Sequence, residues 1–475
     1  MAQSKALLAV AAIAVACGSS SSGAPPAAPV AIEAGFVEIP PRDVVVKGAP
    51  VHIEATARLF YNLVPATNDP ENRPIFFLSN GFAAEVVRAF GTGPKTVADG
   101  GAVVDNPTPF TSFANLVYLE PRQAGYSYDL LPGGTPGSAD CAPSLFNEYV
   151  DAADVALGAI AFLDAHPGLH GPVFWVGESY AGVRLTWILT YLRGQWGNAP
   201  YEDATLADAI ARVAPHRSLR AGQILLEGWV AGGAHANAIA AECTAPDVLA
   251  GVSTSIGASC GGTDACACAG ENDRSAYNYT YSVEHETARE TEASEAHIDP
   301  EKAAALLGVP LTSIPLLAAA ERAKGFRCSP PDATLPSEDA LVAALGPLPA
   351  GQAYYVNYSP LLPGKEQAPA TLDWRTSNLE GIAFLDNVRD VPTFLTAGPR
   401  DLVVPPGALA PALRAIAGAG AIDDSAPDRL GVVFSDGERV LPRFTYPEAG
   451  HMVEMSAPAQ LAADVEAWVR MTSPN

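Results

Sequence analysis

A serine lies between a predicted strand and a predicted helix in the first half of the chain. Residues 173–176, V-F-W-V, are β-branched or aromatic and predict a short buried strand. Residues 177–182 read G-E-S-Y-A-G, and the amphipathic run 183–192 predicts a helix. Small residues in the turn let strand and helix approach closely while the Ser179 hydroxyl points outward. A nucleophile elbow requires this context, although a serine cap at an ordinary strand–helix junction gives the same local pattern.

Further apolar strands alternate with helical segments along the chain. Strands are predicted at 75–78, 116–119, 224–226, 391–397 and 444–446. Helical periodicity covers 150–165, and a closing helix places Leu461, Val465 and Trp468 on one face. Alternation of this kind predicts an α/β fold with a mostly parallel central sheet and helices on both faces.

Two further residues complete a candidate catalytic set with the serine. Asp401 and His451 each follow a predicted late strand, so the order along the chain is Ser179, Asp401, His451. A histidine has the pKa to take the serine proton, and an aspartate fixes the histidine tautomer. The carboxyl ends of parallel strands meet at one edge of a sheet, where such groups converge. Either residue alone would be interpreted as an ordinary turn or surface residue, but the three together predict a catalytic triad.

The composition indicates a globular protein and limits its partners. Of the 475 residues, 48% are hydrophobic and 17% are charged, which is enough apolar surface for a sizeable core. The net charge is −24, and this argues against nucleic acid or an anionic membrane surface as a partner.

The N-terminus predicts export. Lys5 precedes the apolar run 6–16, which has the length of a signal-peptide core and is too short to span a membrane. Cys17 and a serine run follow, so residues 1–16 resemble a bacterial lipoprotein signal with Cys17 as the lipidated residue. Residues 17–31 would be a flexible tether. Ordinary signal cleavage remains an alternative. We therefore expect a protein of the bacterial cell envelope (lipid-anchored, periplasmic or at the outer membrane) or a secreted one, with no other membrane contact.

The remaining cysteines fit an exported protein. They are Cys141, Cys243, Cys260, Cys266, Cys268 and Cys328. Six cysteines allow up to three disulfides, whose pairing the sequence does not define. A metal site at Cys260, Cys266 and Cys268 is the competing interpretation. The absence of a nearby histidine and of C-x-x-C spacing argues against it, so no metal or cofactor is expected.

The strand–helix rhythm stops between about residues 234 and 387. This segment is rich in cysteine, then charged, then helical. It predicts a disulfide-rich and helical cap inserted into the fold. The core would then comprise 32–233 and 388–475.

Several motifs resemble the serine carboxypeptidase family. The most specific is G-E-S-Y-A-G at 177–182, and the others are N-D-P-E-N-R-P at 68–74, F-A-N-L-V-Y-L-E-P-R-Q-A-G-Y-S-Y at 113–128, and the loops 398–405 and 449–453. The chain is similar to a divergent bacterial member of this family. The resemblance implies an α/β-hydrolase fold with a cap.

The resemblance also implies roles for individual residues. Ser179, Asp401 and His451 match the triad, and the backbone N–H of Tyr180 matches one oxyanion donor. Asn80, Glu120 and Glu178 match the residues that bind the substrate's terminal carboxylate. The second oxyanion donor would lie at Phe82, where the family has glycine, so this loop departs from the family pattern.

The expected function is therefore a serine carboxypeptidase that cleaves peptides with a free C-terminal carboxylate through an acyl-enzyme. A carboxyl group donates a hydrogen bond to a carboxylate only while it is protonated, so activity is expected to rise toward acidic pH. An esterase or acyltransferase on the same scaffold is one alternative. A non-catalytic lipoprotein that binds peptides is another.

Overall fold

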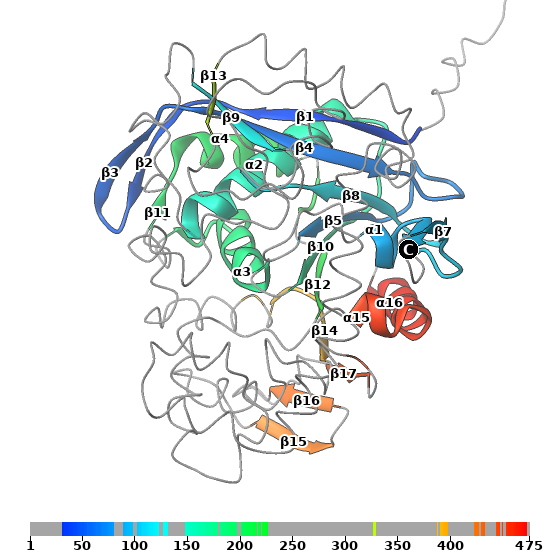
Figure 1. Cartoon of the computed structure of the whole chain (residues 1–475). Coiled ribbons are helices and arrows are strands. Elements are labelled where there is room, and N and C mark those ends of the chain that lie inside the picture. The colour runs from blue at the N-terminus through cyan, green and yellow to red at the C-terminus, as the bar shows by residue number, and fades with distance from the viewer. Residues whose placement is uncertain are drawn as a thin grey trace, which may run out of the picture.

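The structure is a computed structural model of the chain (Figure 1). It describes residues 31–79, 89–97, 102–122, 127–131, 148–178, 181–196, 201–215, 217–219, 221–226, 326–328, 387, 390–397, 422–426, 429–432, 443–446, 449 and 453–472.

A parallel block of strands forms the centre of the main sheet. In spatial order its strands are β8 (Asn115–Leu119), β5 (Ile75–Ser79), β10 (Val173–Glu178), β12 (Gly222–Leu226), β14 (Thr393–Ala397) and β17 (Arg443–Thr445). Every neighbouring pair in this block is parallel. All residues of β5, β8 and β10 are buried, as expected for strands covered on both faces.

Antiparallel strands extend the sheet beyond β8. The long β4 (Thr56–Val64) pairs with β8, and β1 (Glu33–Ile39) and β9 (Tyr128–Leu131) both pair with β4. At this edge β13 (Phe326–Cys328) pairs with β9. The described part of the chain thus contributes ten strands to the main sheet.

The described residues also form three small sheets that are not hydrogen-bonded to the main one. They are β2 (Arg42–Val46) with β3 (Ala49–Ile53) and β11 (Tyr201–Glu202), β6 (Lys95–Val97) with β7 (Val103–Asp105), and β15 (Ile422–Ala426) with β16 (Arg429–Val432). The β2–β3 hairpin turns through Lys47 and Gly48, with φ values of 50° and 79°. Two consecutive positive φ values match the twist of a two-residue hairpin loop.

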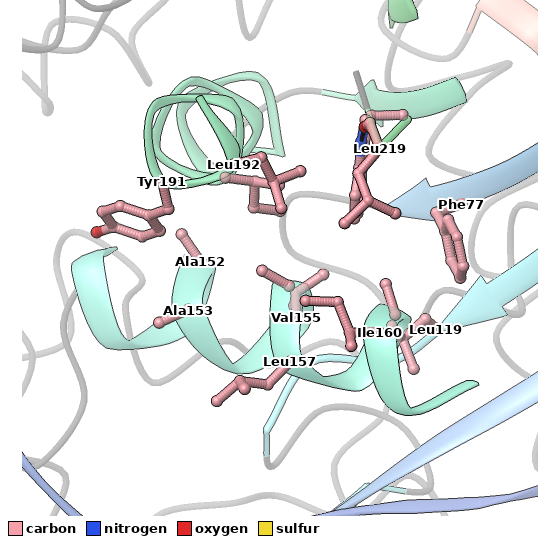
Figure 2. Close-up of a cluster of buried hydrophobic side chains, with 14 of the residues drawn as sticks. Phe77, Leu119, Ala152, Ala153, Val155, Leu157, Ile160, Tyr191, Leu192 and Leu219 are labelled. Atoms are coloured by element: carbon pink, nitrogen blue, oxygen red, sulfur yellow. Dashed lines mark hydrogen bonds between the residues drawn. The ribbon is translucent and has the colours of Figure 1, made fainter. Parts of the chain in front are cut away.

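One face of the main sheet is covered by α2 (Glu148–Ala165), α3 (Ala181–Leu192) and α4 (Ala204–Val213). The buried cluster between these helices and the sheet includes Phe77 and Leu119 from strands and Val155 and Ile160 from α2 (Figure 2). The ring of Phe77 stacks on that of Trp175, 5.3 Å away, within the same layer. This layer is the larger described core.

The opposite face is covered by α1 (Ala89–Thr92), the 3₁₀ helix η2 (Phe110–Ser112), α15 (Val453–Ser456) and α16 (Pro458–Thr472). Phe174 and Phe394 of the sheet each place their rings 5.6 Å from that of Trp468 in α16. Phe76 packs against Phe110 and also contacts Phe174. Because successive strand residues point to opposite faces, Phe76 and Phe77 supply one aromatic ring to each core.

The predicted fold class is confirmed: the sheet is mostly parallel and helices cover both faces. The predicted strands and the three predicted helices are present where they were expected, within a few residues. Helix α4 was not predicted, although Asp203 caps it by accepting a hydrogen bond from the Leu206 N–H at 3.0 Å. The cap remains a prediction, because β13 and Asn387 are the described parts of 234–387.

No helix in the described ranges is both long enough and apolar enough to span a membrane. The signal segment 1–16, Cys17 and most of the predicted tether lie outside the described residues. Of the six other cysteines, only Cys328 is in a described strand, so the disulfides stay a prediction.

Candidate active site

The three predicted catalytic residues follow strands of one parallel block. Ser179 comes directly after β10, Asp401 follows β14, and His451 follows β17. In the sheet these strands follow one another in the order β10, β12, β14, β17, so their carboxyl ends share one edge. The residues themselves lie outside the described part, as do Tyr180, Asn80 and Phe82.

A strand precedes Ser179 and a helix follows it, as the sequence predicts. Strand β10 ends at Glu178 and helix α3 begins at Ala181. A Cβ atom on Gly177 would lie 2.7 Å from Leu185 Cδ1 and 3.0 Å from the carbonyl oxygen of Ala181. Because real Cβ contacts are longer than this, the helix can approach the strand so closely only over a glycine.

Glu178 and Glu120 are the two predicted site residues that the structure describes. Glu178 is the last residue of β10, and Glu120 directly follows β8. Their exposures are 2% and 0%. Strand β5, which ends at Ser79 and leads into Asn80, lies between β8 and β10. The sheet therefore brings two buried glutamates to its carboxyl edge, one on each side of the strand that precedes Asn80.

Backbone contacts fix the position of Glu120. Its N–H donates to the carbonyl oxygen of Phe60 in β4 at 2.9 Å. The Ser127 hydroxyl donates to the carbonyl oxygen of Glu120 at 2.9 Å and accepts from the Phe60 N–H at 2.8 Å. The buried glutamate is thus attached to the antiparallel part of the sheet through its backbone.

Sequence reasoning missed a buried ion pair beside this edge. Arg184 of α3 is 0% exposed, and its Nε atom donates to Asp151 Oδ2 of α2 at 2.7 Å. Its Nη1 atom donates to Ser79 Oγ at 2.5 Å. Burial raises the pKa of Asp151, and the guanidinium of Arg184 opposes that rise. The available signal was an arginine within the otherwise apolar run of α3.

A second network of buried ion pairs is centred on Asp154, three residues after Asp151 in α2. Asp154 accepts from Arg122 Nε at 2.6 Å, and Arg42 Nη2 lies 2.7 Å from its other oxygen. Arg42 Nε also donates to Asp203 at 2.7 Å. Burial alone would raise the pKa of Asp154, but the two guanidinium groups outweigh it and hold the pKa below its ordinary value. Arg122 is two residues beyond Glu120, so this network holds the segment after β8 against α2.

A third buried glutamate follows the predicted histidine. Glu454, in α15, is 0% exposed and packs against Gly91 of α1. A Cβ atom on Gly91 would lie 2.4 Å from Glu454 Cγ, so a glycine is required there. Among the described residues, no group of three or more acidic, histidine or cysteine side chains could hold a metal ion.

The first part of the chain matches a known protein family. Residues 33–192 match the family model described as serine carboxypeptidase. Over these residues, about a third of the chain, the sequence is similar to serine carboxypeptidases. The matched segment runs from β1 to the end of α3 and contains Glu120, Glu178 and Ser179. Asp401 and His451 lie beyond it.

Comparison with solved structures finds chains of similar fold. The chain is similar to Kex1(delta)p, a prohormone-processing carboxypeptidase from Saccharomyces cerevisiae, with a TM-score of 0.51 and 12% identity. That comparison covers 93% of this chain and 91% of the other. The peroxisomal α/β-hydrolase Lpx1 of S. cerevisiae follows with a TM-score of 0.39, 10% identity and coverage of 94% and 91%. A comparison with curated proteins finds no match. At 12% identity, the likeness to Kex1(delta)p shows a shared fold and nothing finer.

Proposed function

We propose that this chain is an exported serine carboxypeptidase, which removes C-terminal residues from peptides through an acyl-enzyme. The observation that carries the proposal is the pair of buried glutamates, Glu120 and Glu178, on either side of β5 at the carboxyl edge of the sheet. Glu178 directly precedes Ser179 in the sequence, which would put recognition of a chain end beside the nucleophile.

The proposed chemistry follows the order of groups along this edge. The Ser179 hydroxyl attacks the scissile carbonyl carbon while His451 takes its proton, and Asp401 stabilises the resulting imidazolium. Backbone N–H groups of Tyr180 and the Phe82 loop stabilise the oxyanion. His451 then protonates the leaving amine. A water molecule, deprotonated by the same histidine, hydrolyses the ester and restores Ser179.

Asn80, Glu120 and Glu178 would bind the terminal carboxylate of the substrate. A glutamate can donate to that carboxylate only when it is protonated, and two neighbouring acids next to a substrate anion favour protonation. Binding of a free acid should therefore strengthen as the pH falls. An ester or amide substrate, which lacks the negative charge, should not show this gain.

Labelling with a fluorophosphonate tests the nucleophile. We expect the wild-type chain to be labelled and the Ser179→Ala variant to remain unlabelled. Absence of labelling in the wild type would contradict the proposal and favour a non-catalytic peptide-binding protein.

Substrate comparison tests the specificity. A blocked dipeptide with a free carboxylate should be hydrolysed faster than its C-terminal amide, with a preference that increases from neutral to acidic pH. Equal hydrolysis of the acid and the amide at every pH would favour an esterase or acyltransferase. Glu178→Gln and Glu120→Gln should reduce the preference for the free acid while fluorophosphonate labelling continues.

The N-terminal lipid anchor is a separate proposal. Expression in a bacterium with a labelled fatty acid should modify the wild-type chain and leave Cys17→Ser unmodified. Secretion of an unmodified wild-type chain would contradict the anchor without affecting the proposed activity.

A further inference from the structure

Arg184 is a fully buried, charged side chain that the proposed chemistry does not use. It lies in the first turns of α3, the helix that follows Ser179, and is 0% exposed. Isolated charges are very costly to bury, so a buried arginine requires partners of defined geometry. Two such partners are Asp151 Oδ2, 2.7 Å from Nε, and Ser79 Oγ, 2.5 Å from Nη1.

These partners connect the two loops that the proposed active site needs. Ser79 is the last residue of β5 and directly precedes Asn80. In the sheet, Ser79 is the register partner of Gly177, which is two residues before Ser179. Through one guanidinium group, the helix after the nucleophile is therefore bonded to the strand end that leads into Asn80.

The shape of the arginine head group makes this contact directional. A guanidinium is planar and presents its N–H groups in a fixed fork, whereas a lysine is a flexible point charge. Asp151 holds the fork from the α2 side, which leaves Nη1 aimed at the Ser79 hydroxyl. The position of that hydroxyl is thus coupled to α2 and α3, two helices that pack against each other in the larger core.

We infer that Arg184 is a positioning residue, which sets the start of the loop after β5 so that Asn80 can bind the substrate carboxylate at a fixed distance from Ser179. This inference rests on the proposed function. It assigns Arg184 and Asp151 to recognition of the chain end, through Ser79, and not to bond cleavage.

The test variant is Ser79→Ala, which removes the hydroxyl acceptor and retains both charges. Thr393→Val is the matched control, because its buried hydroxyl also makes a hydrogen bond, to the Val391 carbonyl at 2.8 Å. Thr393 begins β14 and so lies at the amino end of the parallel block, away from the proposed site. A double variant, Asp151→Leu with Arg184→Met, removes both charges together and avoids leaving one buried alone.

Three quantities are measured for each protein: the KM and kcat for a peptide with a free carboxylate, the rate of fluorophosphonate labelling, and the midpoint of urea unfolding. We expect Ser79→Ala to raise KM several-fold, because the strand end that leads into Asn80 loses its hydrogen bond to Arg184, while labelling stays within about twofold of the wild-type rate. The double variant should raise KM at least as much. Thr393→Val should lower the unfolding midpoint and leave KM unchanged.

Two results would overturn the positioning role. One is a wild-type KM in Ser79→Ala, and the other is an equal rise of KM in Thr393→Val, which would indicate a general loss of stability. Failure of the proposed function can be distinguished from failure of the positioning role. In that case the wild-type protein itself would be neither labelled nor active on the peptide. That outcome would overturn both.

Discussion

The hydroxyl group of Ser127 donates a hydrogen bond to the carbonyl oxygen of Glu120, at 2.9 Å. The same hydroxyl oxygen accepts from the Phe60 N–H, so one small side chain bridges β4 and the segment that carries the buried glutamate. Ser127 is itself 4% exposed, and water has little access to replace it.

Ser127→Ala should therefore affect both stability and activity. It leaves a buried N–H group without its acceptor, which costs about 1–3 kcal/mol in the free energy of unfolding. The backbone of Glu120 should also become less constrained, which raises the KM for free-acid peptides. Urea unfolding and peptide kinetics measure the two effects. Ser112→Ala is the control, because that hydroxyl donates to the Pro109 carbonyl in an exposed turn. Equal effects of the two substitutions would contradict the bridge.

Asp154→Asn should be one of the most destabilising conservative substitutions in the chain. Its carboxylate compensates Arg122 and Arg42, and all three side chains are at most 2% exposed. Loss of one member of a buried ion pair costs about 3–5 kcal/mol, because the remaining charge stays buried. Denaturant unfolding measures this loss.

The comparison for Asp154→Asn is Asp164→Asn. Asp164 pairs with Arg212 at the surface, where both side chains are more than 40% exposed. Exposed pairs contribute about 0–1 kcal/mol, so this variant should unfold close to the wild type. An equal loss of unfolding free energy in the two variants would contradict the larger contribution expected of the buried ion pairs.

Glu33→Gln should change how stability depends on pH. The hydrogen bond from His166 lowers the pKa of Glu33 despite partial burial. Burial lowers the pKa of His166, but bonds to Glu33 and to the Phe162 carbonyl outweigh it and raise the pKa. The contribution of Glu33 is lost as the pH falls through its lowered pKa. That of His166 is lost as the pH rises through its raised pKa.

The stabilising effect of this pair is thus complete at about pH 5–6, between the ordinary pKa values of the two side chains, and declines toward the lowered pKa of Glu33 and the raised pKa of His166. The difference in unfolding free energy between wild type and Glu33→Gln should be greatest there, at about 1 kcal/mol or less because the pair is partly exposed. It should shrink above about pH 8. A difference independent of pH would contradict the ion pair. His52→Gln, at an exposed contact with Asp43, serves as the control.

Gly171→Ala should be strongly destabilising and Gly168→Ala should be tolerated. Both glycines lie between α2 and β10. A Cβ atom on residue 171 would lie 1.8 Å from the carbonyl oxygen of Arg73. A Cβ atom on residue 168 would have no neighbouring atom within 4 Å. The backbone would have to move at the start of β5, at a cost of about 1–3 kcal/mol. Thermal unfolding of the two variants measures the contrast, and equal midpoints would contradict the close approach.

The strands were predictable because burial on both faces requires a continuous apolar run. Residues 75–78 and 116–119 carry that pattern and became β5 and β8. Helix α4 lacks such a run, and only Leu206 and Val213 are buried in it. Its start signal, Asp203, is a single residue that also fits a turn. The order of the strands within the sheet likewise cannot be predicted from any short stretch of sequence.

The two described glutamates of the candidate site were found through sequence motifs. Arg184 was not, because an arginine in an amphipathic helix ordinarily lies on the solvent side. Its partner Ser79 is 105 positions away, and Arg42 is 161 positions from Asp203. Contacts across such separations depend on how helices pack on the sheet, which residue types and spacing do not encode.

Strands β12 and β14 are hydrogen-bonded neighbours, although one ends at Leu226 and the next begins at Thr393. The chain thus leaves the parallel block and re-enters it at adjacent positions. Parallel neighbours need a crossover of about a dozen residues and set no upper limit on its length. The register of the sheet therefore does not depend on how long that crossover is. Related proteins could lengthen, shorten or exchange the segment, and so vary which molecules reach the edge, while the strands beneath it stay the same.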